Sequence, residues 1–403
     1  MHRRRLLAIA YTCSPSRGSE AGAAWGTLLT LAEHADVTVV TSPYFSEELR
    51  AWYKAHPDEG LHFVEVPQPG YGRLVDHVTR WHRQADFAKY LGWLNAAGER
   101  SRALVADGSF DAAVHVAFGS YWTPSPVTDL GIPSIWGPVG GATKTPLRLW
   151  PALGWRGVLG EVEKRVAIAA AARTPSTRAT WRQATVRVAE APATQRVLSR
   201  DGSSVPKLQR AILSRVPEVA HPEQREPFVV FPSSLQGRKG PRLALRALAA
   251  GPAHLRLVFA ADGYERRPLE RLARRLGVAD RVEFRGWVSR EEMFSLFVRS
   301  TAVMFTGVRE EGGCALAEAM LLGAPVVVLG VGGARMIAES STDPDRVAVV
   351  EPRSVTRVVD DLGAALARFA ADPSPRTDGH LDQQTTAEAL RQVVEDAIAR
   401  GSR

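Results

Sequence analysis

Residues 309–339 form the most informative stretch of this chain. The stretch begins Arg309-Glu310-Glu311-Gly312-Gly313-Cys314-Ala315-Leu316-Ala317-Glu318-Ala319-Met320, continues through Leu-Leu-Gly-Ala-Pro and a run of valines, and reaches Gly332-Gly333. This order predicts an acidic loop, an amphipathic helix and a buried strand. Glu310 precedes the predicted helix and Glu318 lies inside it, so both carboxylates can face one cleft. Because glycines let backbone N–H groups approach an anion at a helix N-terminus, we expect a phosphate-bearing, polyhydroxylated ligand.

Outside this stretch, short apolar strands alternate with helical patterns. We predict strands at residues 6–10, 36–41, 61–66, 112–117, 132–136, 185–189, 228–231, 255–260, 282–285, 302–305 and 347–350. Such alternation predicts an α/β fold with parallel sheets.

The length of 403 residues predicts two domains rather than one. The polar, proline-containing segment 214–227 is the predicted linker. It separates an N-terminal domain, 1–213, from a C-terminal domain, 228–380. The remainder, 381–403, contains a helix that can pack back on the N-terminal domain.

The composition is that of a globular protein, with 45% hydrophobic and 23% charged residues. Apolar runs are only strand-sized, so no membrane span is expected. The basic start, residues 1–10, has an apolar part too short for a signal peptide and is better interpreted as a first strand. Two cysteines, Cys13 and Cys314, make no disulfide framework and indicate a reducing cytoplasm.

The net charge of +8 has two interpretations. A basic surface can attract nucleic acid or anionic lipid. Alternatively, the excess of arginine reflects a genome rich in G and C, in which arginine codons are used where other genomes use lysine codons. Only six of the 51 basic residues are lysine. The arginines form no basic stripe interleaved with aromatics, so no nucleic-acid partner is expected. Weak peripheral membrane contact stays open, for example through the aromatic helical stretch 71–100, although core packing is the favoured interpretation there. The sequence does not indicate an oligomeric state.

Two glycine-containing loops follow predicted strands of the first domain. One carries Gly18, Ser19 and Glu20, and the other carries Gly140 and Gly141. Neither has the G-x-G-x-x-G or Walker spacing. Since ligands bind at the carboxyl edge of a doubly wound sheet, we expect these five residues to line the cleft and contact an acceptor. An ordinary strand-to-helix turn is the alternative.

The carboxylate pair resembles a known signature. Glu310, Gly313 and Glu318-Ala319-Met320 resemble the E-x7-E motif of retaining glycosyltransferases of family 4, which have the GT-B fold. Further motifs follow in the family's order: the Gly-Ser-Glu loop, 238–240, 262–263 and 280–286, with a Gly-Pro-Val-Gly-Gly segment at 137–141 similar to one branch. The resemblance covers the whole chain. It implies two Rossmann-like doubly wound domains that face a central cleft.

The resemblance also implies roles for individual residues. Glu318 would hydrogen-bond the donor ribose, and Glu310 would contact sugar hydroxyls. Backbone N–H groups of Gly313, Cys314 and Ala315 would hold phosphate. Lys239 would neutralise the departing diphosphate.

Three further residues complete the implied site. Backbone near Trp287 would meet the base. Where the family has an arginine before the lysine, this chain has Ser234, and Arg238 is a candidate replacement. The family often carries His-x-His in its first domain, but here a single His115 stands in the predicted strand. It is either a catalytic residue or a packed one.

The implied activity is retaining transfer of a hexosyl unit from a nucleotide diphosphate sugar, with UDP or GDP favoured. The acceptor would be a hydroxyl of a small molecule, natural product or envelope glycan. No cofactor or metal is expected, and the D-x-D at 343–345 looks incidental. Two alternatives stay open: a sugar-nucleotide epimerase of similar fold, and a catalytically silent protein that binds nucleotide sugar.

Overall fold

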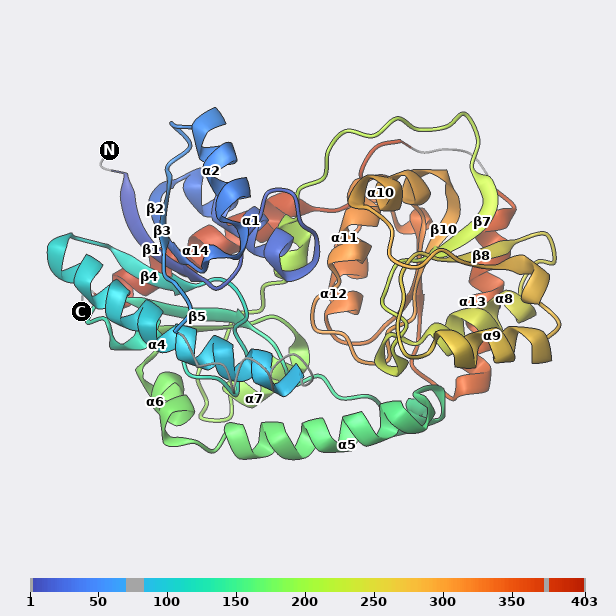
Figure 1. Cartoon of the computed structure of the whole chain (residues 1–403), viewed down its shortest axis with the longest axis horizontal. Helices are drawn as coiled ribbons and strands as arrows, with labels where there is room; N and C mark the ends of the chain where they lie inside the picture. The colour runs from blue at the N-terminus through green and yellow to red at the C-terminus, as the bar shows by residue number, and fades with distance from the viewer. Residues whose placement is uncertain (1–2, 70–82, 373–376, 402–403) are drawn as a thin grey trace.

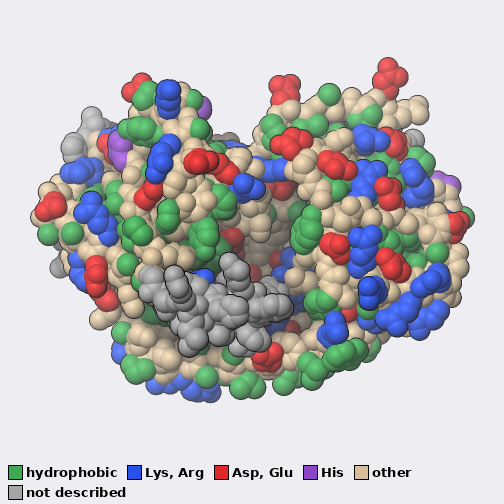
Figure 2. Space-filling model, in the orientation of Figure 1, with side chains coloured by type: hydrophobic (Ala, Val, Ile, Leu, Met, Phe, Trp, Pro, Cys, Tyr) green, Lys and Arg blue, Asp and Glu red, His purple; other side chains and the backbone are tan. Residues whose placement is uncertain are grey.

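A computed structural model describes residues 3–69, 83–372 and 377–401. Two α/β domains lie side by side, with a long helix along their lower edge (Figure 1). Figure 2 shows a hollow between the domains. Of the predicted helical stretch 71–100, residues 71–82 lie outside the described part, and the described helix starts at Arg83.

The first domain contains a six-stranded sheet in which every pairing is parallel. Its strands in chain order are β1 (Arg4–Ala10), β2 (Ala35–Thr41), β3 (Leu61–Glu65), β4 (Ala112–His115), β5 (Ser134–Val139) and β6 (Val186–Ala189). Its helices include α1 (Ser19–Ala32), α2 (Ser46–Ala55), α4 (Arg83–Asp107), α6 (Pro175–Gln183) and α7 (Pro192–Leu198). The spatial order β3-β2-β1-β4-β5-β6 is that of a doubly wound sheet.

The second domain repeats this plan. Its strands are β7 (Glu226–Phe231), β8 (Arg256–Phe259), β9 (Val282–Phe284), β10 (Ser300–Phe305), β11 (Val326–Leu329) and β12 (Val347–Val350). Its helices are α8 (Pro241–Ala250), α9 (Arg266–Arg275), α10 (Arg290–Arg299), α11 (Cys314–Leu321), α12 (Gly333–Glu339) and α13 (Val355–Ala370). Its spatial order is β12-β11-β10-β7-β8-β9. Read from β9 and renumbered from β7, this is the strand order of the first sheet. The predicted fold class, α/β with two doubly wound domains, is confirmed.

Burial explains why these sequences form strands and helices. Every residue of β10 and β11 is buried, as expected of strands covered by helices on both faces. In α13, Val358, Leu362, Leu366 and Phe369 recur at helical spacing and pack into the second core, while charged residues face outward. Strand β7 begins at Glu226, two residues inside the predicted linker, because this part of the segment pairs with β10.

One segment of the first half crosses to the second domain. After β5 the chain forms the short helix η3 (Leu147–Ala152) and then α5 (Gly154–Ala171). Leu149, Ala152 and Leu153 belong to the core of the second domain, although they lie within the predicted N-terminal domain 1–213. Helix α5 then returns along the lower edge of the molecule toward α6 (Figure 1). The range 1–213 is therefore not one self-contained body.

The end of the chain crosses in the opposite direction. Helix α14 (Gln383–Gly401) packs against β4, β5, β6 and α1 of the first domain. Leu390, Val393, Val394 and Ala397 join the first core. None of the helices in the described ranges is both apolar enough and long enough to cross a membrane.

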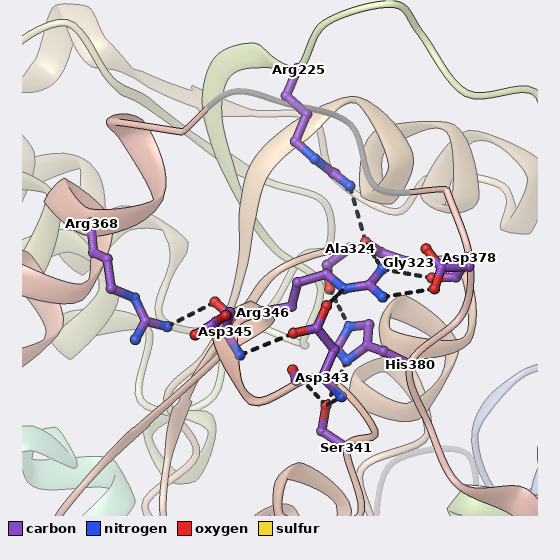
Figure 3. A network of polar contacts seen from close by, with 10 residues as sticks. All are labelled: Arg225, Gly323, Ala324, Ser341, Asp343, Asp345, Arg346, Arg368, Asp378 and His380. Atoms are coloured by element: carbon purple, nitrogen blue, oxygen red, sulfur yellow. Dashed lines mark hydrogen bonds and ion pairs between the residues drawn. The ribbon is translucent and has the colours of Figure 1, made fainter.

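A polar network fixes the chain where it leaves the second domain (Figure 3). Arg346 donates from Nε to Asp343 Oδ2 over 2.9 Å and from Nη2 to Asp378 Oδ2 over 3.1 Å. Asp343 also accepts from the N–H of Asp345. The carboxylate of Asp343 and the backbone of Asp345, both in the D-x-D segment, thus take part in a structural anchor.

His380 belongs to the same anchor. Its Nδ1 lies 2.8 Å from Ser341 Oγ, and its Nε2 lies 2.9 Å from the carbonyl oxygen of Ala324. Burial lowers the pKa of His380 to about 4. The imidazole is therefore neutral at physiological pH and holds the returning chain against the second domain.

Candidate active site

The loops at the carboxyl ends of the two sheets meet between the domains. From the first domain come the loops after β1, β4 and β5, and from the second come the loops after β7, β10 and β11. Loops at this edge are where doubly wound sheets bind ligands. Figure 2 shows acidic and basic side chains within the hollow.

Glu310 and Lys239 meet at the centre of the site. Lys239 ends the short helix η5 (Gly237–Lys239) after β7, and Glu310 lies in the loop after β10. Lys239 Nζ forms an ion pair with Glu310 Oε2, with 16% and 8% of their side chains exposed. The structure thus brings together two of the predicted catalytic residues from segments 71 residues apart.

Glu318 lies on α11 and faces a partner that the sequence did not suggest. Arg290, the first residue of α10, donates from Nη2 to Glu318 Oε1 over 2.8 Å. Burial raises the pKa of Glu318, and the guanidinium of Arg290 opposes this effect. A Cβ atom placed on Gly18 of the first domain would lie 3.4 Å from Glu318 Oε1. Gly18 and Glu318 therefore face each other across the cleft.

The residues predicted to bind phosphate lie at the N-terminus of α11. Gly313 has φ +154°, a backbone conformation in which any other residue would be strained. Cys314 begins the helix, and Ala315 follows it. The Cys314 thiol donates to the carbonyl oxygen of Ser19 over 3.2 Å, a contact from the second domain to the first. Burial raises the pKa of this thiol, so it remains protonated.

Glu311 joins the domains at the floor of the cleft. Its Oε1 accepts from the N–H of Thr143 over 2.5 Å, and its carbonyl oxygen accepts from Gln209 Nε2 over 2.8 Å. Burial raises the pKa of Glu311, while the contacts with Thr143 lower it. A Cβ on Gly333 would lie 1.8 Å from the Glu311 carbonyl oxygen, which explains the glycine after β11. The acidic pair was visible in the sequence, but this role of its second member was not.

Gly140 and Gly141 lie at the same junction. A Cβ on Gly140 would lie 3.3 Å from Glu311 Cβ, and one on Gly141 would lie 2.7 Å from Trp122 Nε1. The loop after β5 therefore packs closely on the second domain. The small size of Gly140 allows this approach, whereas Gly141 packs against Trp122 of its own domain.

A buried ion cluster supports the first-domain side of the cleft. Arg210, in the short helix η4 (Arg210–Leu213), bonds Glu20 Oε1 at 2.9 Å and Glu190 Oε1 at 3.2 Å. The N–H of Phe118 also donates to Glu20 Oε1. Glu20, predicted to contact an acceptor, thus has its carboxylate engaged by the protein itself. Sequence reasoning missed Arg210 and Glu190.

The members of this cluster have shifted pKa values. Burial raises the pKa of Glu190 to about 7, although Arg210 opposes this shift. Burial also acts to raise the pKa of Glu20, but Arg210 and the Phe118 N–H outweigh it and lower this pKa. The charges of Arg210 and Glu20 therefore balance, and Glu190 titrates near neutral pH.

His115 does not occupy the position expected of a catalytic residue. Its side chain is completely buried, with Nδ1 2.7 Å from Ser125 Oγ and Nε2 3.3 Å from the Tyr90 hydroxyl. Burial lowers the pKa of His115 to about 4, so the ring stays neutral. Tyr90 in turn donates to the carbonyl oxygen of Phe118. The packed interpretation holds: His115 supports the loop after β4 and is not placed to contact a substrate.

The remaining predicted residues lie around the second domain's edge. Arg238 Nε donates to Gln236 Oε1 over 3.3 Å, and the Arg238 carbonyl oxygen accepts from Val308. Ser234 is half-buried in the loop after β7. Trp287 is 73% exposed, so its indole lies on the surface. Any contact with a base would come from backbone in this region.

An aromatic recess opens beside Gly18 and Ser19. Its volume is about 580 Å³, and its aromatic lining is Tyr11, Tyr44, Phe45, Tyr90 and Phe118. The ring of Tyr11 lies 5.0 Å from that of Tyr90 and 5.2 Å from that of Phe118. The sequence offered no periodic signal for this recess because its rings come from separate elements.

Acidic and sulfur ligands do not gather into a metal site in the part of the chain that the structure describes. No three His, Cys, Asp or Glu side chains in those ranges lie together in a way that could hold an ion.

In comparisons with known proteins, the second domain is similar in sequence to glycosyltransferases. Residues 216–376 match the family model Glycosyl transferases group 1. A 2-deoxystreptamine glucosyltransferase of Streptomyces kanamyceticus is 32% identical over 206 residues, which are 48% of this chain and 53% of that enzyme. A D-inositol 3-phosphate glycosyltransferase of Xylanimonas cellulosilytica is 32% identical over 145 residues, 35% of this chain and 34% of that enzyme. The chain spans about half, or less, of the length of these relatives.

Structural similarity extends over the whole chain. The structure of Anabaena HepE in complex with UDP and glucose is 15% identical and matches 98% of this chain and 100% of its own, with a TM-score of 0.52. The fold is that of GT-B glycosyltransferases. Within this GT-B fold, Glu310, Glu318 and Lys239 lie in the segment that matches the group 1 family model.

Proposed function

We propose that this chain is a retaining glycosyltransferase that moves a hexosyl unit from a nucleoside diphosphate sugar to an acceptor hydroxyl. The observation that carries the proposal is the meeting of Lys239, Glu310 and the N-terminus of α11, with Glu318 on the same helix. Cation, carboxylates and helix N-terminus lie at the sheet edge that faces the other domain. The match of residues 216–376 to a glycosyltransferase family supports the same activity.

In this proposal the donor lies against α11. Glu318 binds the ribose hydroxyls, exchanging its present partner Arg290 for the nucleoside. The N–H groups of Gly313, Cys314 and Ala315 bind phosphate, where the helix dipole favours an anion. UDP and GDP sugars are the favoured donors, and the UDP found with the Anabaena structure supports the former.

Departure of the diphosphate is the step that the site must assist. In the structure Lys239 forms an ion pair with Glu310. When the donor binds, its diphosphate competes for the ammonium group and leaves Glu310 to accept hydrogen bonds from sugar hydroxyls. Arg238 precedes Lys239 and is our candidate for the second phosphate-binding cation, in place of the arginine that Ser234 replaces. A cation fixed where negative charge develops lowers the barrier without the help of a metal.

The acceptor is proposed to enter from the aromatic recess of the first domain. Its rings offer flat apolar faces for a cyclic acceptor, and Gly18 and Ser19 connect the recess to the donor side. A ring-containing small molecule, natural product or glycan unit suits this lining.

Donor binding followed by product analysis tests the proposal. Thermal-shift screening against UDP, GDP, ADP and dTDP sugars identifies the base, and mass spectrometry with cyclic acceptors detects the transferred hexose. We expect stabilisation by one nucleotide and a product with retained anomeric configuration.

Other outcomes separate the alternatives. A new sugar epimer formed from donor alone identifies an epimerase. Donor binding without transfer or hydrolysis identifies a catalytically silent protein. This alternative is kept because Ser234 stands where the family has a phosphate-binding arginine. Absence of binding to every nucleotide contradicts the proposal.

A further inference from the structure

Helix α5 presents an apolar stripe to the outside of the molecule. Trp155, Leu159, Val162 and Val166 are 68%, 60%, 47% and 67% exposed. Their spacing of four, three and four residues places them on one helical face. A surface helix ordinarily buries such a stripe, but Glu161 is the only buried residue among the 18 of α5. Figure 2 shows hydrophobic side chains along the lower edge, where α5 lies in Figure 1.

Arginines gather at both ends of this stripe. At the N-terminal end, Trp155 shares a recess of about 620 Å³ with basic residues of α8 and α9, namely Arg242, Arg271, Arg274 and Arg275. At the other end, α5 leads to exposed arginines at and within α6, namely Arg173, Arg178 and Arg182. Figure 2 shows Lys and Arg side chains at both ends of the lower edge. The surface is therefore an apolar line between two positive groups.

We propose that the outer face of α5 binds an anionic lipid bilayer. The stripe would enter the boundary between headgroups and acyl chains, where Trp is favoured, while the arginines contact headgroup phosphates. Apolar insertion and attraction to anionic lipid add in such a helix. This inference rests on the surface alone and not on the proposed glycosyl transfer.

The charges favour a membrane over a second copy of the chain. Two α5 helices paired about a two-fold axis would bury the stripes against each other. In an antiparallel pair the arginines of α9 would face those of α6, and in a parallel pair each group would face itself. Like charges repel in both arrangements, whereas an anionic surface neutralises both groups at once.

The membrane face and the reaction site lie on opposite sides of α5. On the inner side Glu161 accepts from Arg309 over 2.5 Å, and Arg309 is the residue before Glu310. The outer stripe is therefore free to meet lipid without covering the loop that carries Glu310.

Vesicle flotation of the full-length protein tests the inference. Vesicles of phosphatidylcholine alone are compared with vesicles in which about one third is phosphatidylglycerol. We expect binding to the anionic vesicles only, and weaker binding at high salt because the charges are screened. The double variant Leu159→Ser with Val166→Ser should lose binding. Tyr53→Ser, an exposed aromatic on α2, is the matched control and should bind as the wild type does.

The arginines are tested separately. Each basic residue close to an anionic surface strengthens binding by roughly fivefold, so Arg271→Ser, Arg274→Ser and Arg275→Ser together should weaken it by at least about tenfold. Arg391→Ser, on exposed α14 surface, is the control. Circular dichroism and the Tm establish that each variant is folded.

Three results overturn the inference. The first is a wild-type protein that does not float with anionic vesicles. The second is a stripe variant that binds them as tightly as the wild type. The third is a concentration-dependent dimer in sedimentation velocity that Leu159→Ser with Val166→Ser dissociates, because the stripe would then be an interface between copies.

Discussion

The carboxylates of Glu310 and Glu318 each have a basic partner from a different element. Glu310 is paired with Lys239 from η5, and Glu318 is paired with Arg290 from α10. A buried carboxylate without such a partner would be costly, so each pair compensates for the burial of its carboxylate. A donor must therefore replace these contacts with equally good ones. This requirement favours ligands that supply both hydroxyls and an anion.

Removing the carboxylate of Glu318 tests the ribose contact. Hydrogen bonds to a charged group contribute about 1.5–3 kcal/mol, so Glu318→Ala should weaken nucleotide binding by about 10- to 100-fold. Isothermal titration calorimetry with the nucleotide selected by the thermal-shift screen measures this change. Glu339→Ala removes an exposed helix carboxylate and should leave the Kd unchanged. An unchanged Kd for Glu318→Ala would remove Glu318 from the donor site.

Lys239 is expected to act mainly on turnover. Removing one preorganised group that stabilises developing charge costs about 10²–10³ in kcat. Lys239→Ala should show this loss, and the Kd for the donor should change much less. Lys54→Ala, an exposed lysine of α2, is the control for a general charge effect. Full turnover by Lys239→Ala would contradict its role at the leaving group.

Glu190 gives the protein a pH-dependent stability term. Its pKa is about 7 in the folded protein and 4.5 in an ordinary environment. Between these values the folded state holds the extra proton, so the contribution of Glu190 to stability falls as the pH rises from 4.5 to about 7. Glu190→Gln lacks this term, and its Tm relative to the wild type should rise across this window and level off above it. A difference in Tm that is constant between pH 5 and 8 would contradict the assignment.

The sequence predicted that Glu310 and Lys239 belong to one site, and the structure brings these two residues together, but the sequence did not predict the contacts behind them. Glu310 and Lys239 could be predicted together because each stands in a recognisable motif. Arg290 and Arg210 could not, since their partners are fixed by the folding of distant segments. For His115 the sequence left a catalytic and a packed role open, because a strand pattern does not show whether a side chain faces a cleft or a core.

At the scale of elements, α5 is unusual because one side chain anchors it. Glu161 accepts from Arg165 at 3.1 Å, from Arg309 at 2.5 Å and from the N–H of Thr145 at 3.3 Å. The helix thereby joins the loop after β5 to the loop that carries Glu310. Besides this carboxylate, Val158 packs α5 against the core of the second domain.

Loss of this anchor should loosen both loops. Removing one partner of a buried ion pair typically costs about 3–5 kcal/mol, so Glu161→Ala should lower stability by a similar amount. Hydrogen exchange should increase in residues 144–172 and 306–313, and turnover should fall. Glu163→Ala, which changes an exposed carboxylate two residues away, is the control. Unaltered exchange in both loops would show that α5 is held by other contacts.

Sequence patterns located elements best where burial imposed them. Strand β10 was predicted to begin two residues late, at 302, and β11 was predicted as the buried strand formed by the run of valines. Helix α5 begins at Gly154, although Gly154, Gly157 and Gly160 resemble helix breakers in the sequence. The apolar residues of α5 are exposed, so they do not form the core-facing stripe by which an amphipathic helix is usually recognised. Strand β7 was placed two residues late because Glu226 and Pro227 have linker-like composition.

For the whole molecule, two crossing segments make the domains interdependent. Segment 147–153 completes the core of the second domain, and α14 completes that of the first. Parallel α/β sheets followed from the alternating strands and helices, and their doubly wound arrangement was implied by the family resemblance. The two crossing segments could not be predicted from the sequence, because an apolar residue does not reveal which of two cores will bury it.

The dependence of the first domain on the end of the chain leads to the last prediction. Leu390 of α14 is 2% exposed and packs in the first core, so Leu390→Ala should cost about 2–5 kcal/mol. Arg391→Ala changes the exposed neighbour and should have little effect. Hydrogen exchange followed by mass spectrometry can assign the loss to a domain. Faster exchange in β4, β5 and β6, with β10 and β11 unchanged, is expected because α14 covers the first sheet and not the second. Equal acceleration in both sheets would mean that the domains unfold as one unit, and no change in the first sheet would mean that α14 contributes little to its core.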